Sequence, residues 1–337
     1  EYMTKWYGEK KKPHYGIVLA GGRKQDPEAA RGLVKLVGNR LFPSIVRATA
    51  LSLLGNYPSE QSAAAFGAAL NDEAALVRMA AARYLPEQEP SERVRALEPL
   101  LYDPAKAVRI EAVQALGSVP RERLRADVRS RYESVLAEYR EAMYYTADFA
   151  PSRHNLGNFY LNSGKLDEAV VQFQAAIRID SEFYPAKVNL AMVCNQMGQN
   201  KKAESLLRQV VDAHPEFYEI QYSLGLLLAE NKNYKEAASF LERAAEGIPQ
   251  RARIHYNLGL LQAFLQEEKK AESALLKAVD LEPDNRDYLY AVAEFYLKRG
   301  RLSQARTFAR QLVERYPDWP TARDMLAYIN SVSGDDE

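Results

Sequence analysis

Apolar and small residues recur in the second half of the chain with a period of 34 positions. Each period holds a small residue, then an alanine, then in most cases a proline. The series are Gly157, Ala191, Gly225, Gly259 and Ala293; Ala169, Ala203, Ala237, Ala271 and Ala305; and Ser181, Pro215, Pro249, Pro283 and Pro317. Small residues let helices approach closely, and proline ends a helix. The pattern therefore predicts five helix-turn-helix units over residues 150–319.

A shorter period, of 31 positions, occupies residues 27–120. The strings VRATALSLL, VRMAAARYL and VRIEAVQAL begin at Val46, Val77 and Val108, and helix-breaking residues precede each string. This spacing predicts units of helix, turn and helix in which the second helix buries its Val, Ala and Leu residues. The arginine that follows each valine is expected to cap or brace the neighbouring turn. These arginines are Arg47, Arg78 and Arg109.

Two helices are expected outside the repeats. Residues 121–149 keep a helical spacing of apolar positions from Leu124 to Met143, which predicts a connecting helix that resembles half of a later unit. Pro320 opens a last helix, so residues 320–337 are expected to form a capping helix and an acidic tail.

The lead-in, residues 1–26, is basic and aromatic. Its apolar run from Tyr15 to Ala20 lies between Pro13 and a Gly-Gly pair, which predicts one short helix that ends at the glycines. One interpretation is a docking segment for another domain, and the other is a plain interdomain linker. The docking residues would be Trp6, His14 and Tyr15.

The two periods resemble two known repeat families. The 34-residue period resembles the tetratricopeptide repeat, and the shorter one resembles a short HEAT repeat. The resemblance implies an all-α fold, a right-handed α-solenoid in which HEAT-like repeats continue into a tetratricopeptide superhelix with a C-terminal capping helix. It also implies a non-catalytic scaffold for protein–protein interaction.

Composition narrows the classes of function. Lys+Arg and Asp+Glu both number 45, so no overall charge attracts nucleic acid or an acidic membrane. The single cysteine, Cys194, excludes a disulfide framework and a zinc site made of cysteines. The sequence holds no apolar run of ~18 residues, no HExxH and no CxxCH. We therefore expect a protein partner, and neither membrane insertion nor a catalytic, metal or covalent haem site in this chain.

The first helices of the 34-residue units carry the candidate binding residues. The position two before the small residue holds Asn155, Asn189, Ser223, Asn257 and Ala291, and the position before it holds Tyr222, Tyr256 and Tyr290. Carboxamides can bind the main chain of an extended peptide, and this series resembles the asparagine ladder of O-linked N-acetylglucosamine transferases. Alternatively, these side chains pack repeat against repeat. The predicted groove comprises Asn155, Asn158, Asn189, Met192, Tyr222, Arg253, Tyr256, Asn257, Tyr290 and Glu294.

The order of parts suggests a narrower hypothesis. The lead-in carries Trp6, HYG at 14–16 and GGR at 21–23, followed by VRATAL repeats and then the 34-residue units. This order resembles the C-terminal half of bacterial multihaem c-type cytochromes. It implies a docking or assembly module in an extracytoplasmic electron-transfer system, periplasmic or extracellular, with haem only on a preceding part or a partner. The alternative is a cytoplasmic adaptor that binds an extended peptide of a secretion, motility or signalling partner, and an enzyme is the least favoured class.

Overall fold

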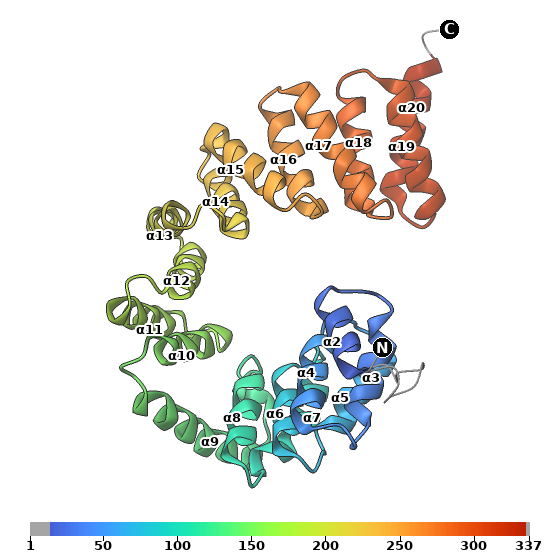
Figure 1. The fold of residues 1–337 in the computed structure, drawn as a ribbon. Helices are drawn as coiled ribbons and strands as arrows, with labels where there is room; N and C mark the ends of the chain where they lie inside the picture. Colours follow the sequence, from blue (N-terminus) through green and yellow to red (C-terminus); the bar gives the residue numbers. More distant parts are fainter. Residues whose placement is uncertain (1–13, 335–337) are drawn as a thin grey trace, which may run out of the picture. The chain divides into compact units, whose positions relative to one another are not determined.

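The computed structural model describes residues 14–334, and this part of the chain contains helices but no strand (Figure 1). The helices form consecutive pairs, as the two periods predict, and the all-α solenoid fold is confirmed. The chain divides into two compact units, the first ending at Asp180 and the second beginning at Ser181. None of the helices described is long and apolar enough to cross a membrane.

The first unit begins with the HEAT-like pairs. Its elements are α2 (Tyr15–Arg23), α3 (Ala29–Gly38), α4 (Ser44–Leu54), α5 (Glu60–Ala69), α6 (Ala75–Arg83), α7 (Pro90–Leu97), η1 (Glu98–Tyr102), α8 (Lys106–Ala115), η2 (Arg121–Arg123), α9 (Ala126–Tyr145), α10 (Ala150–Asn162) and α11 (Leu166–Ile179). The three VR strings form α4, α6 and α8, which pack in series. Their alanines Ala50, Ala81 and Ala112 are fully buried, so the predicted buried face is confirmed.

The arginine that follows each valine links its own repeat to the next element. The ion pairs are Arg47–Asp72, Arg78–Asp103 and Arg109–Glu138. Arg78 also donates from Nη1 to the carbonyls of Asp72 and Glu73, at 2.6 and 2.9 Å. Arg109 does the same to the carbonyls of Asp103 and Pro104 in the turn before α8, at 2.8 and 3.2 Å. The predicted bracing of a turn is confirmed at these two positions.

The buried acids of this series make stability depend on pH. Burial alone would raise the pKa of Asp72, but hydrogen bonds from Arg47 and from the Ala74 amide outweigh it and leave the pKa below its ordinary value of 3.8; Asp103 behaves in the same way beside Arg78. Because each carboxyl group has a lower pKa in the folded state than in the unfolded chain, its ionised form stabilises the fold at pH values above the unfolded-state pKa. This stabilisation is lost as the pH falls through the folded-state pKa.

We therefore expect the melting temperature to be level above about pH 5 and to drop below about pH 4. Thermal melts followed by circular dichroism across this range measure it. The Asp72→Asn, Asp103→Asn double variant should melt lower at neutral pH and lose less of its stability in acid. An unchanged pH profile in this variant would show that these two carboxylates do not carry the effect.

Helix α2 corrects one boundary. The short helix is confirmed, but the glycines predicted to end it lie inside it, because α2 continues to Arg23. Gly22 is buried, and a Cβ there would lie 3.1 Å from Leu53 and 3.2 Å from Leu33. Gly22 therefore allows α2 to pack closely on the α3–α4 pair. The helix ends one residue later, at Arg23.

The connecting helix is confirmed as α9, whose apolar positions face the first unit's core. Tyr132 and Tyr139 are almost wholly buried. The Tyr139 hydroxyl donates to the carbonyl of Asn155 on α10 at 3.1 Å, and burial raises the pKa of this phenol above its ordinary value. The α9 helix thus joins the HEAT-like pairs to α10 within one core, while the domain boundary at residue 149 stays a prediction.

The second unit holds four helix pairs and a last helix. They are α12 (Tyr184–Gln196), α13 (Asn200–Ala213), α14 (Tyr218–Glu230), α15 (Tyr234–Gly247), α16 (Ala252–Phe264), α17 (Glu268–Leu281), α18 (Arg286–Leu297), α19 (Leu302–Arg315) and α20 (Pro320–Gly334). Each second helix ends two residues before the recurring proline, as the period predicts. The last helix packs on α19, so the predicted capping helix is confirmed.

Candidate functional site

Exposed apolar side chains recur at one position of three successive first helices in the second unit. They are Met192 on α12, Leu226 on α14 and Leu260 on α16, which are 47%, 38% and 39% exposed. Each directly follows the small residue that packs against the second helix of its pair. Because equivalent positions of successive repeats face the same side, these residues form a row. Phe264, 64% exposed, lies one turn beyond Leu260 and extends it. We call these four residues the apolar row.

A polar group without an internal partner lies beside the apolar row. Asn195, one turn after Met192, donates from Nδ2 to the Glu230 carboxylate at 3.3 Å. Its Oδ1 atom is buried, and within residues 14–334 it accepts no hydrogen bond. A buried acceptor without a donor costs about 1–3 kcal/mol.

The asparagine series has an internal role at one position. Asn257 on α16 donates from Nδ2 to the hydroxyl of Tyr222 on α14 at 2.8 Å. The ring of Tyr222 is buried, and the guanidinium of Arg251 stands 5.0 Å from its centre. Asn257 and Tyr222 therefore join two neighbouring repeats, as the packing interpretation expects.

The other two tyrosines of the series also make contacts within the protein, Tyr256 with the next repeat and Tyr290 with the end of its own. Tyr256 packs on Tyr288, with ring centres 4.9 Å apart, and Tyr290 packs on Trp319 at 5.6 Å. The exposed Arg253 places its guanidinium 5.4 Å from the Tyr256 ring, and burial raises the pKa of Tyr256. Contact of these tyrosines with a ligand stays a prediction.

The remaining predicted groove residues are divided between the two units. Asn155 and Asn158 lie on α10 in the first unit, where Asn155 is exposed and Asn158 is 3.5 Å from each ring nitrogen of His154. In the second unit, Asn189 is half-buried on α12, and Glu294 on α18 is ion-paired with Lys298 at 2.9 Å. Their role in binding stays a prediction.

Three residues of the apolar row, Leu226, Leu260 and Phe264, were not predicted. Met192 is among the predicted groove residues, but Leu226 and Leu260 are not. They repeat Met192 at steps of 34, so a fourth series in the same register was present in the sequence. A leucine beside a packing glycine is normally a core residue. Only the exposed fraction of its side chain in the structure shows that it lies on the surface instead.

The predicted docking segment falls partly outside the described residues, because Trp6 lies there. His14 is exposed and caps α2, accepting a hydrogen bond from the Gly16 amide at 3.1 Å. Tyr15 is half-buried, with its ring centre 5.9 Å from that of Phe42. Both side chains thus have contacts within the first unit, and their docking role stays a prediction.

The described residues offer few groups for covalent or metal chemistry. Among them, no cluster of three or more His, Cys, Asp or Glu side chains could hold a metal ion. Cys194 is buried, and burial raises the pKa of its thiol, which lowers its reactivity. Burial likewise lowers the pKa of His154, which favours the neutral imidazole.

Family models match most of the chain. A HEAT-repeat model matches residues 32–117, and tetratricopeptide-repeat models match residues 150–183, 188–252, 252–285 and 269–329. The chain contains tetratricopeptide repeats. HEAT repeats precede them, so both repeat types predicted from the two periods are found in the expected order. Tetratricopeptide repeats are typically non-catalytic interaction modules, which supports a scaffold that binds protein.

Several solved structures of tetratricopeptide proteins are similar to about half of the chain. MamA from Desulfovibrio magneticus RS-1 is 22% identical, with 51% of this chain and 97% of MamA covered and a TM-score of 0.48. YrrB, described as a tetratricopeptide protein with an unusual peptide-binding site, is 20% identical over 55% of this chain and 96% of YrrB, with a TM-score of 0.49. PilF from Pseudomonas aeruginosa is 22% identical over 53% of this chain and 88% of the PilF chain, with a TM-score of 0.45. No curated protein sequence matches the chain.

Proposed function

We propose that the tetratricopeptide repeats of the second unit bind an extended segment of a partner protein along the apolar row. The observation that carries this is the exposure of Met192, Leu226 and Leu260 at one position of three successive repeats. Contiguous exposed apolar patches on a protein surface often mark binding sites. The buried Asn195 Oδ1 beside the row supports a peptide main chain as the second element recognised.

The spacing of the apolar row favours an extended ligand with a defined pattern. Packed helices lie about 8–10 Å apart, so successive side chains of the row are spaced by a similar distance. An extended chain advances about 3.3–3.6 Å per residue, which places every third residue opposite the next repeat. The partner segment is therefore expected to carry apolar side chains three residues apart. Their burial against the row would supply the affinity, and the main chain would satisfy Asn195.

The test begins with peptides selected on the immobilised protein from a displayed random library, whose affinities are then measured by calorimetry. Selected peptides should share apolar residues at intervals of three. The Leu226→Asp, Leu260→Asp double variant should bind them at least about 10-fold more weakly, because charges would replace two apolar contacts. Its melting temperature should stay close to that of the wild type, since both side chains are already exposed.

Val171→Asp is the matched control, because Val171 is an exposed apolar residue on α11 in the first unit. This variant should bind the selected peptides like the wild type. Equal affinity of the double variant and the wild type would exclude the apolar row as the binding surface.

A finer proposal concerns the partner. The lead-in resembles that of bacterial multihaem c-type cytochromes, which supports a docking or assembly module for an extracytoplasmic haem protein. The alternative is a cytoplasmic adaptor for a secretion, motility or signalling partner. The coding sequence before Glu1 separates the two: several CxxCH motifs would support the cytochrome proposal, and an initiator Met within a few residues would contradict it.

A further inference from the structure

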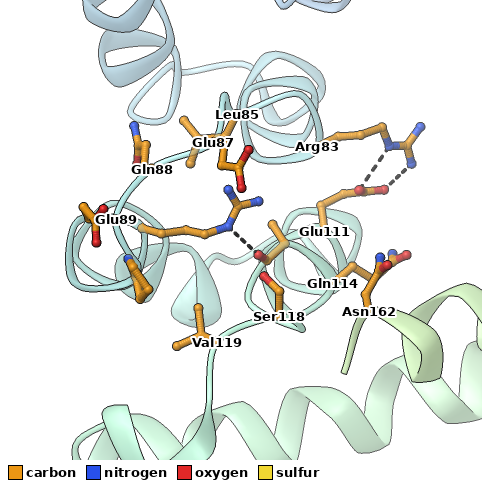
Figure 2. A pocket seen from close by; sticks show the side chains of 13 residues that line it. Arg83, Leu85, Glu87, Gln88, Glu89, Glu111, Gln114, Ser118, Val119 and Asn162 are labelled. Atoms are coloured by element: carbon orange, nitrogen blue, oxygen red, sulfur yellow. Dashed lines mark hydrogen bonds and ion pairs between the residues drawn. The ribbon is translucent and has the colours of Figure 1, made fainter. Parts of the chain in front are cut away.

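A cavity of about 1010 Å³ lies in the first unit, among the HEAT repeats and far in sequence from the apolar row. Its wall is formed by the end of α6, the segment at 84–89, the start of α7, the end of α8 and Asn162 at the end of α10 (Figure 2). A volume of this size is at the upper end of ordinary ligand pockets. The cavity could therefore hold a short peptide or several linked groups.

Among the described residues that line the cavity, one arginine forms no ion pair within 4 Å. Arg93, on α7, donates from Nε to the Ala115 carbonyl at 2.7 Å and from Nη1 to the Pro86 carbonyl at 3.5 Å. Within residues 14–334 it forms no ion pair within 4 Å; burial lowers the pKa of its guanidinium, and the negative charge of nearby Glu87 acts in the opposite direction. A guanidinium has five N–H donors, so several remain for a ligand.

Four other arginines of the HEAT repeats differ in this respect. Each has a carboxylate partner, namely Arg47–Asp72, Arg78–Asp103, Arg83–Glu111 and Arg109–Glu138. The Arg83–Glu111 pair lines the same cavity, where two dashed lines join the side chains in Figure 2. The acid of that pair is thus already engaged, and Arg93 is the one of these five arginines that forms no ion pair within 4 Å.

The surroundings of Arg93 suit the main chain of a peptide. The Gln88 Oε1 atom is buried and has no hydrogen-bond donor among the described residues. Gln114, Ser118 and Asn162 add carboxamide and hydroxyl groups to the wall (Figure 2), while Leu85 contributes apolar surface. Carboxamides both donate and accept, as peptide N–H and C=O groups require.

We propose that this cavity binds a peptide carboxylate, from a C-terminus or an acidic side chain, with Arg93 as its cation and the neighbouring amides holding the peptide main chain. An Arg–carboxylate pair can form two parallel hydrogen bonds, which gives both affinity and orientation. Glu87 also lines the cavity and is exposed, and its negative charge faces the region where the ligand carboxylate would bind. Glu87 therefore competes with the ligand for Arg93.

Three acetylated tripeptides test the proposal, with binding to the full chain measured by calorimetry. Acetyl-Ala-Ala-Ala with a free carboxylate tests a C-terminus, acetyl-Ala-Glu-Ala amide tests an acidic side chain, and acetyl-Ala-Ala-Ala amide carries no charge. At least one charged peptide should bind, and the uncharged one should bind at least about 10-fold more weakly. Which charged peptide binds more tightly identifies the source of the carboxylate. Equal binding of all three, or binding by none, would overturn the proposal.

Variants separate the ligand contact from a structural role of Arg93. Arg93→Gln should lower the affinity for the charged peptide at least about 10-fold, whereas Arg95→Gln, an exposed change on the same helix, should not. Glu87→Gln changes an exposed side chain and should strengthen binding several-fold by removing the competing charge. If Glu87→Gln instead lowers the melting temperature and leaves binding unchanged, Glu87 is the internal partner of Arg93 and the proposal is wrong.

Discussion

Replacing Arg47 by alanine is expected to destabilise the first unit by about 3–5 kcal/mol. The side chains of Arg47 and its partner Asp72 are only 7% and 6% exposed. Removing the guanidinium leaves the Asp72 carboxylate buried without a cation. It also removes the donor to the Val37 carbonyl at the end of α3, where Arg47 Nε lies at 3.0 Å. Both groups would then lack a partner within the protein while remaining largely buried.

Chemical denaturation followed by circular dichroism measures this loss, and Arg40→Ala is the matched control. Arg40 pairs with Glu73 at 2.5 Å, but the two side chains are 62% and 80% exposed. An exposed pair contributes about 0–1 kcal/mol, so Arg40→Ala should change stability little. Similar losses of unfolding free energy in the two variants would show that burial does not determine how much these ion pairs contribute to stability. Restoration by Arg47→Met, Asp72→Asn would show that the cost lies in the unpaired charge.

The helices were predictable because the sequence repeats its own packing positions. A small residue, an alanine and a proline recur at fixed intervals, so each helix end is supported by several units at once. The two glycines near residue 21 lacked such support. Glycine ends helices but also permits close contact between them. At Gly22 the close contact with Leu33 and Leu53 is the role that the structure shows. A single occurrence in the sequence could not distinguish these two roles.

The candidate binding residues were less predictable because they depend on contacts between repeats. A carboxamide bonds a peptide or a neighbouring helix equally well, and at Asn257 the partner Tyr222 is 35 residues away. Leucine next to a packing glycine suggests a core position, yet Leu226 and Leu260 are exposed. The environment of Arg93 is set by α8 and the turn before α7, so its missing acid partner could not be seen in the sequence either.

Replacing Gly259 by leucine is expected to destabilise the second unit by about 3 kcal/mol. The α16 and α17 helices meet so closely here that even a Cβ atom would lie 2.7 Å from Leu275 Cγ and 3.0 Å from the Leu275 backbone nitrogen. A side chain could rotate away, but the backbone nitrogen is fixed by the helix. The pair must therefore separate. Because each repeat is stabilised by its neighbours, the α14–α15 and α18–α19 pairs should lose stability with it.

Gly67→Leu makes the same change where there is room, because no atom lies within 4 Å of a Cβ at Gly67, two residues before the end of α5. It should stabilise the protein slightly, by roughly 0.5–1 kcal/mol, since glycine is a poor helix former. Denaturant titration measures the change in unfolding free energy of both variants. Amide hydrogen exchange shows which helices lose stability in Gly259→Leu. Faster exchange should begin in α16 and α17 and extend to the adjoining pairs, while the HEAT repeats keep their protection. Uniform loss across the chain would instead mean that the two units unfold together.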